Sequence, residues 1–128
     1  MGMRSVKELT VYAKAYDLAM QIFEISKRFP KDEAYSLTSQ IRRSSRSVCM
    51  NLREAWAKRR YVSHFVSKLT DCDGDNGETD TSLDFARDCQ YITADEFMQL
   101  SNLSTGIGKM LGSMILHPNP FVFCPPDS

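Results

Sequence analysis

The spacing of apolar residues restricts the fold of this chain more than any other feature of the sequence. In the first and second thirds of the chain, apolar or small residues recur every three or four positions. One set is Val11, Ala15, Leu18, Ile22, Ile25 and Phe29, and another is Ala34, Leu37, Ile41, Ser44, Val48, Leu52 and Ala55. Such spacing places the side chains along one side of an α-helix. No segment alternates as a half-buried strand does, so we predict an all-α protein.

Local signals predict where four helices begin and end. The first is expected from Ser5, where SVKE has the form of a capping box, to Phe29, because Pro30 disfavours helical geometry in the residue before it. The second is expected from about Asp32 to about Arg59. The third should begin near Ser63, meet the polar stretch of residues 71–82 and then resume.

The fourth helix should begin at Thr93, where TADE is a second capping box, and end at the HPNP of residues 117–120. Its glycines, Gly106, Gly108 and Gly112, would let a neighbouring backbone approach closely. Four helices of roughly 20 to 28 residues with short links indicate an up-down-up-down four-helix bundle. We place this bundle in residues 1–116, followed by an irregular tail in residues 117–128.

The first segment also carries a second apolar set beside the first. Its members are Leu9, Ala13, Tyr16, Met20 and Phe23. Two neighbouring apolar stripes are wider than one bundle core requires. We therefore expect the first helix to bury a second face against another subunit, so the chain itself is the first predicted partner.

Composition excludes several classes of protein. No run of residues approaches the ~18 apolar positions of a membrane span, and MGMRSVKELT lacks the apolar region of a secretory signal. We therefore expect a cytoplasmic protein without a membrane partner. The four cysteines form no CxxC pair, and the two histidines have no obvious partner, so we expect no metal site and no cofactor.

The charge is segregated along the chain although the net charge is zero. Residues 36–70 contain eight Lys or Arg and one acid, whereas residues 71–96 contain nine acids and one Arg. This asymmetry permits a basic patch for a polyanion. It equally permits the two segments to neutralise each other within the fold or across an oligomer interface.

The stretch SQIRRSSRS of residues 39–47 contributes to two polar stripes of the second helix at ~100° per residue. One is a polar seam beside the apolar side, and its residues would seek partners on a neighbouring helix or subunit. The other is a basic stripe expected to face outward. The polar seam consists of Gln40, Arg43, Ser47, Asn51 and Glu54, and the basic stripe consists of Arg42, Arg46, Arg53 and Arg60.

The polar segments could be interpreted as a catalytic serine site or as a calcium-binding loop, but both interpretations are weaker than a structural role. A serine nucleophile would need a base, for which His64 is the only plausible residue, and neither G-x-S-x-G nor S-x-x-K occurs. Asp71, Asp73 and Asp75 imitate the start of a calcium-binding loop. The glycine then comes one position late, at Gly77, and the expected Glu is replaced by Ser82. We expect no catalytic residues and no enzyme activity.

The segment SLTSQIRRSSRSVCMNLREA resembles the four-helix bundle family of the intervening sequences of bacterial large-subunit rRNA genes. The residues that match the signature of that family are Phe29, Pro30, Leu37, Thr38, Ser39, Gln40, Ile41, Arg42, Arg43, Ser47, Asn51 and Glu54, followed by Gly74, Glu78, Leu83, Asp88 and Tyr91. Ala55 replaces a glycine of the family pattern. Asp71 and Asp75 stand where it has apolar or small residues, so they should face solvent or meet an arginine of either stripe.

The resemblance implies a bacterial, cytoplasmic bundle that assembles into a ring-like homopentamer without known enzymatic activity. One branch, the accessory variability determinant of diversity-generating retroelements, binds its reverse transcriptase and RNA through a basic surface. Two functions therefore stay open. The first is a homo-oligomeric structural or interaction protein; the second is a nucleic-acid-binding accessory, with RNA or a reverse transcriptase as partner through Arg42, Arg46, Arg53 and Arg60. The zero net charge and the pI of about 6.7 weaken the second.

Overall fold

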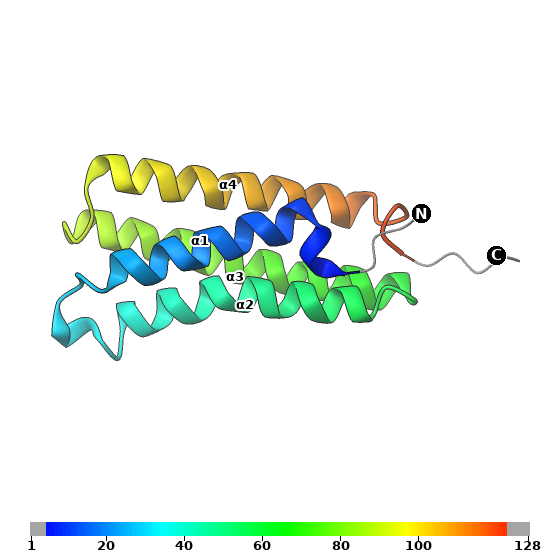
Figure 1. Ribbon diagram of the computed structural model, residues 1–128, viewed down its shortest axis with the longest axis horizontal. Helices are drawn as coiled ribbons and strands as arrows, with labels where there is room; N and C mark the ends of the chain where they lie inside the picture. The colour runs from blue at the N-terminus through cyan, green and yellow to red at the C-terminus, as the bar shows by residue number, and fades with distance from the viewer. Residues whose placement is uncertain (1–4, 123–128) are drawn as a thin grey trace, which may run out of the picture.

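Four long helices pack side by side in a computed structural model that describes residues 5–122 (Figure 1). They are α1 (Thr10–Ser26), α2 (Leu37–Ala57), α3 (Val62–Asp88) and α4 (Ala94–Leu116), with short 3-10 turns η1 (Val6–Glu8) and η2 (Lys31–Glu33). Each helix runs antiparallel to the next, and contacts join α1 to α2, α2 to α3, α3 to α4 and α4 back to α1. The all-α, up-down-up-down prediction is confirmed.

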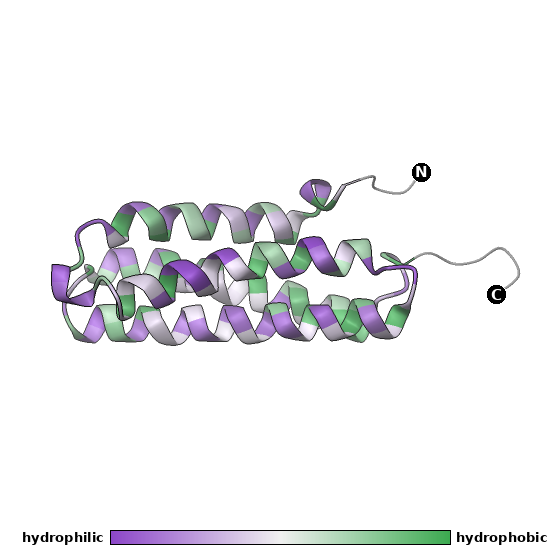
Figure 2. Cartoon of the chain, turned by 90° about the horizontal axis from the view of Figure 1, so that it is seen from below, coloured by the Kyte–Doolittle hydropathy of each residue, from purple (hydrophilic) through white to green (hydrophobic). Residues whose placement is uncertain are grey.

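The core consists of the apolar residues that face the centre of the bundle. Hydrophilic and hydrophobic residues alternate along each visible helix, as expected for helices with one buried and one exposed side (Figure 2). Among the largest fully buried side chains are Leu18, Ile22, Ile41, Leu52, Phe65, Leu69, Leu83, Ile107 and Leu111. The first apolar set of α1 is buried except for Ile25, which is half-buried, as the spacing predicts.

The start of the first helix differs from the expectation. Ser5 does act as a cap, since its hydroxyl accepts a hydrogen bond from the Lys7 amide at 3.2 Å, but it caps the short turn η1. Leu9 then adopts an extended conformation, with φ −74° and ψ 133°, and α1 begins only at Thr10. The break lets both Val6 and Leu9 reach the core, where each is almost completely buried.

The second helix also begins later than expected, at Leu37 rather than near Asp32. The side chain of Glu33 takes the place of the missing helical turn. Its Oε1 accepts hydrogen bonds from the Ser36 hydroxyl at 2.6 Å and from the Leu37 amide at 3.4 Å, so it satisfies a donor at the helix start. The end of α2 at Ala57 leaves Arg60 in the connection to α3.

Helix α3 is continuous through the polar stretch that was expected to interrupt it. Cys72, Asn76, Thr79, Ser82 and Leu83 are all buried, so one side of this stretch belongs to the core. The helical geometry of residues 71–82 is incompatible with the calcium-binding loop considered above. Residues 5–122 contain no group of three or more metal-ligating side chains.

Helix α4 begins as predicted. The Glu96 amide donates to the Thr93 hydroxyl at 3.1 Å, and the Thr93 amide donates to Glu96 Oε1 at 2.8 Å, which completes the capping box. Within the described part of the chain, no neighbouring backbone approaches its glycines, contrary to the expectation; at Gly108 the neighbour is a side chain, and a Cβ would lie 3.4 Å from Asn76 Nδ2. Gly106 and Gly112 have open space around them.

The helix ends before His117, and residues 117–122 are irregular, as expected for the first half of the tail. The rest of the predicted tail lies outside the described residues. None of the helices described in residues 5–122 has the length and hydrophobicity that crossing a membrane would require.

Candidate functional site

The two stripes lie on the two flanks of the buried side of α2. The polar seam faces α3 and the basic stripe faces α1. Seam residues Ser47 and Asn51 are half-buried, whereas Gln40, Arg43 and Glu54 are exposed. We expected Arg43 and Glu54, as seam residues beside the core, to have buried partners; this is wrong, because their long side chains extend past the helix contact into solvent.

Two residues of the polar seam find partners on α3. Asn51 Nδ2 donates to Asp75 Oδ2 at 2.7 Å. Lys68 Nζ lies 2.7 Å from Glu54 Oε2 and 3.2 Å from Asp71 Oδ2, and these two interactions make a small surface network. The hydrogen bond from Lys68, followed by its charge, lowers the pKa of the Glu54 carboxyl. Neither Asp71 nor Asp75 meets an arginine; an asparagine and a lysine serve instead.

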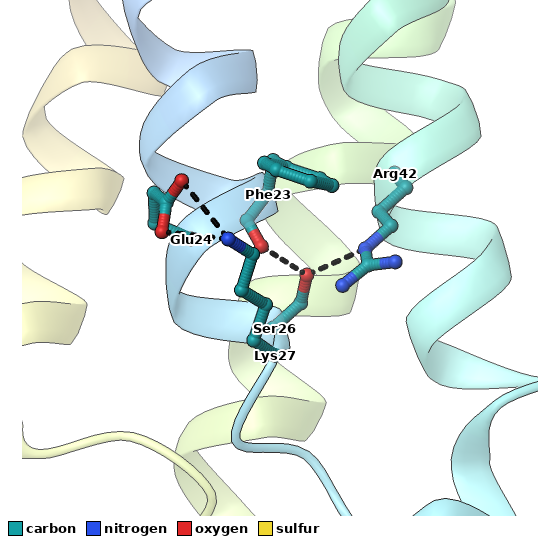
Figure 3. Close-up of polar contacts among 5 residues, drawn as sticks. All are labelled: Phe23, Glu24, Ser26, Lys27 and Arg42. Atoms are coloured by element: carbon teal, nitrogen blue, oxygen red, sulfur yellow. Dashed lines mark hydrogen bonds and ion pairs between the residues drawn. The ribbon is translucent and has the colours of Figure 1, made fainter.

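Arg42 of the basic stripe does not point outward as expected. Its Nε donates to the Ser26 hydroxyl at 2.7 Å, and that hydroxyl donates to the carbonyl of Phe23 at 3.1 Å (Figure 3). The guanidinium also lies over the Phe23 ring, 5.0 Å from its centroid. Arg42 thus fastens the start of α2 to the end of α1, and it is only half-exposed.

Aromatic rings of α1 lie among the arginines of α2. Arg46 approaches the same Phe23 ring at 5.5 Å, and Lys27 approaches it at 4.7 Å. Tyr12 and Tyr16 stack at 6.2 Å further along α1. No aromatic residue lies between Arg42 and Arg46 in the sequence; the fold places Phe23 of the neighbouring helix beside both.

The remaining two arginines of the stripe are exposed. Arg53 follows Arg46 by two helical turns on the same side of α2, and Arg60 lies beyond the helix end. The structure therefore brings Arg42, Arg46 and Arg53 together along one flank and leaves Arg60 apart.

Comparison of the sequence with models of protein families shows which family the chain belongs to. The model of the 23S rRNA-intervening sequence protein family matches residues 7–113, which is most of the chain. The chain belongs to the 23S rRNA-intervening sequence protein family. The resemblance inferred from the α2 segment is confirmed.

This chain is similar to a solved structure from Bacteroides thetaiotaomicron, a protein of the S23 ribosomal protein family. That protein, described as having unknown function, shares 29% sequence identity with a TM-score of 0.75, over 83% of this chain and 98% of its own. A search of curated proteins finds no match. The family relationship thus supports the four-helix fold and assigns no activity.

A buried polar layer is the feature that sequence reasoning missed. Ser44 and Thr79 share a hydrogen bond of 2.8 Å between α2 and α3, and Asn76 Nδ2 donates to the Ser104 carbonyl of α4 at 2.9 Å. The signal for Ser44 was present, since it occupies an apolar position of the repeat. Asn76 and Thr79 were missed because they lie in the polar stretch of residues 71–82, and Ser104 was missed because it is a polar residue within the apolar repeat of the fourth helix.

The three cysteines within residues 5–122 are free thiols; Cys49 and Cys72 are buried and Cys89 is exposed. Burial raises the pKa of Cys49 to about 11 and that of Cys72 to about 12, so both stay protonated at neutral pH. Neither is an activated nucleophile. His64 is exposed, and its ring lies tilted against that of Tyr61, with the centroids 5.4 Å apart and an angle of 56° between the planes.

Proposed function

We propose that this protein is a non-enzymatic bundle that assembles with copies of itself and serves as a structural or interaction protein in the cytoplasm. The exposed apolar side of α1 carries this proposal. Tyr16 is 54% exposed and Met20 is 45% exposed, on the side of α1 that faces away from the core. Neighbouring Ala13 is exposed as well. An apolar stripe of this kind suits a protein interface better than a water-facing surface.

The environment of the cysteines supports the cytoplasmic part of the proposal. Cys89 is exposed and unpaired, and free thiols suit a reducing compartment. The resemblance noted from the sequence implies a ring-like homopentamer, and we adopt that stoichiometry as the proposed assembly. Within residues 5–122, the raised pKa values of Cys49 and Cys72 and the lack of a group of three or more metal-ligating side chains support a non-enzymatic role.

Light scattering at micromolar concentration tests the self-assembly. The expected mass is about five times the 14.6 kDa of the chain. A Tyr16→Glu/Met20→Glu variant should have a lower mass at unchanged helicity, because each charge would have to be desolvated at the interface. Asp17→Lys, which changes the charge of an exposed residue between them, is the matched control. A monomeric wild type would refute the proposal.

A second candidate function is nucleic-acid binding, with RNA as the ligand or with a reverse transcriptase as the partner. The observation that favours it is the Phe23 ring beside Arg42 and Arg46, because proteins that bind single-stranded nucleic acid combine aromatic rings, on which bases stack, with positive charges that contact phosphates. Arg46, Arg53 and Arg60 supply exposed positive charge, while the zero net charge reduces long-range attraction.

A salt titration with single-stranded and structured RNA tests this candidate. Binding through phosphates should weaken steeply with salt, and an Arg46→Glu/Arg53→Glu/Arg60→Glu variant should lose it. Arg42 is left unchanged because it fastens α2 to α1. Absence of binding even at about 50 mM salt would leave only the assembly function.

A further inference from the structure

Opposite sides of the bundle carry opposite charge. Because the helices contact one another in the order α1, α2, α3, α4 and back to α1, the side made by α1 and α2 lies opposite the side made by α3 and α4. On the first side, Arg46 and Arg53 have no carboxylate partner among residues 5–122. On the second, Asp73 and Asp80 have no ion pair within the same residues. Each side therefore holds charge that the single chain leaves uncompensated.

Contacts between helices identify which residues lie on each side. Arg46 reaches Phe23 of α1, and Arg53 lies two turns further along the same flank. On α3, the side chain of Asn76 donates a hydrogen bond to the Ser104 carbonyl of α4. Asp73, three positions before Asn76, and Asp80, four positions after it, lie on the same flank of α3. Asp84 continues this flank, and burial followed by the charge of Asp84 raises the pKa of the Asp80 carboxyl.

The charges on the two sides stand at matching heights. The hydrogen bonds Asn51–Asp75 and Ser44–Thr79 show, to within one helical turn, which part of α2 is level with which part of α3. Because these helices are antiparallel, each step forward along α2 corresponds to one step back along α3. The pairs that fall level in this way are Arg53 with Asp73, Arg46 with Asp80 and Arg42 with Asp84.

We propose that the α1–α2 side of one copy docks on the α3–α4 side of a second copy, with Arg53 facing Asp73 and Arg46 facing Asp80. The inference rests on the proposed self-assembly and names its two contact surfaces. Copies standing side by side in the same orientation bring α2 against α3 of the neighbour, so the level charges meet. The reverse arrangement, one α1–α2 side against another, would bring arginines together.

Apolar residues complete the same contact. Side-by-side copies also place α1 against α4 of the neighbour. Within one chain the side chain of Gln99 donates to that of Gln21 at 2.7 Å, which puts Met20 of α1 level with Leu100 of α4, within one helical turn of Met98. Both methionines are exposed, Met98 at 59%. The contact joins two different sides of the bundle. An open assembly therefore has a free α1–α2 side at one end and a free α3–α4 side at the other, and these two sides meet when the assembly closes into a ring.

Charge exchange tests the two surfaces. An Arg46→Glu/Arg53→Glu variant and an Asp73→Lys/Asp80→Lys variant should each have the mass of a monomer by light scattering at about 50 mM salt, because like charges then face each other. The chain that combines all four substitutions should regain the wild-type mass. This recovery separates a docking role from misfolding, and circular dichroism of each variant checks its helicity.

The matched control uses the same two helices on another side of the bundle. Arg43→Glu/Glu78→Lys exchanges charge at exposed positions of α2 and α3 that border the groove between these helices, and it should leave the mass unchanged. Unchanged mass in both reversed variants, or no recovery in the combined chain, would overturn the inference. Reversed variants that lose RNA binding but keep the mass of the wild-type assembly would also overturn it. A monomeric wild type would instead refute the self-assembly on which it rests.

Discussion

Gln90 has a backbone conformation that is unfavourable for its side chain. Its φ is 63°, the only positive value for a non-glycine residue among residues 5–122, and it follows the end of α3. Its amide donates to the Arg87 carbonyl at 2.9 Å. Glycine is the usual residue in this position after a helix, because it lacks the Cβ that clashes there.

We therefore expect Gln90→Gly to raise the free energy of unfolding by about 1 kcal/mol. This is near the lower end of the cost that left-handed geometry imposes on a residue with a Cβ. Urea denaturation measures the change. Gln40 is exposed in the helical backbone of α2, so Gln40→Gly should instead lower the free energy of unfolding by about 1 kcal/mol. A decrease at both positions would contradict the conformational explanation.

Glu33 joins the start of α2 to the end of α3. Its Oε2 accepts a hydrogen bond from the Tyr91 hydroxyl at 2.8 Å, in addition to the bonds from Ser36 and Leu37. The bonds from Ser36 and Tyr91 lower the pKa of the Glu33 carboxyl. A lowered pKa in the folded state means that the ionised group stabilises the fold above its unfolded pKa, and that this contribution is lost as pH falls through the folded pKa.

The expected result is a pH-dependent difference between wild type and Glu33→Gln. The melting temperature of the variant should be lower at pH 7, and the difference should shrink as the pH approaches about 3, below the ordinary glutamate pKa. Thermal melts across this range provide the measurement. Asp32→Asn, at the exposed neighbouring position, is the control. A difference that stays constant with pH would show that the carboxylate charge is not the cause.

Among the elements, α3 is the one that sequence reasoning described least well. Its apolar repeat fails at residues 71–82 because the helix buries Asn76, Thr79 and Ser82 in place of aliphatic side chains. A hydroxyl or amide can occupy the core when a neighbouring helix supplies its hydrogen-bond partner. That partner lies far away in sequence, so periodicity of apolar residues alone could not reveal it.

The glycines of α3 weaken the helix without an evident packing role. A Cβ added at Gly74 or at Gly77 would meet nothing within 4 Å. Gly74→Ala and Gly77→Ala should therefore each stabilise the chain by about 1 kcal/mol through helix propensity. Thermal unfolding at matched concentration measures this. Gly108→Ala is the contrasting change, because its Cβ would touch Asn76, and a gain there as large as at Gly74 would argue against the packing difference.

The pair Ser44–Thr79 offers a test of the buried polar layer between α2 and α3. Removing one hydroxyl leaves the other without its interhelical partner, so Thr79→Val should cost about 1–3 kcal/mol of unfolding free energy. The double variant Ser44→Ala/Thr79→Val should cost less than the sum of the two single changes. Urea denaturation of all four chains gives the coupling, and strict additivity would mean that the 2.8 Å contact contributes nothing.

At the scale of the whole molecule, the four-helix arrangement follows from the sequence, while the orientation of the surface stripes does not. The repeats in α1, α2 and α4 give the class, and TADE gives the start of α4. Whether Arg42 faces solvent or α1 depends on which helix packs beside that flank, and a wheel drawn for one helix lacks this information. Glu33 shifted the start of α2 for a similar reason, because a side chain replaced backbone bonds.

The separation of charge across the bundle also gives the molecule a large transverse dipole moment in spite of its zero net charge. A dipolar particle of this kind presents a cationic side to one charged matrix and an anionic side to another. A variant made monomeric without changing these charges should therefore be retained at neutral pH and low salt by both cation and anion exchangers. An assembled ring would hide the opposed charges between its subunits and should pass through both more freely.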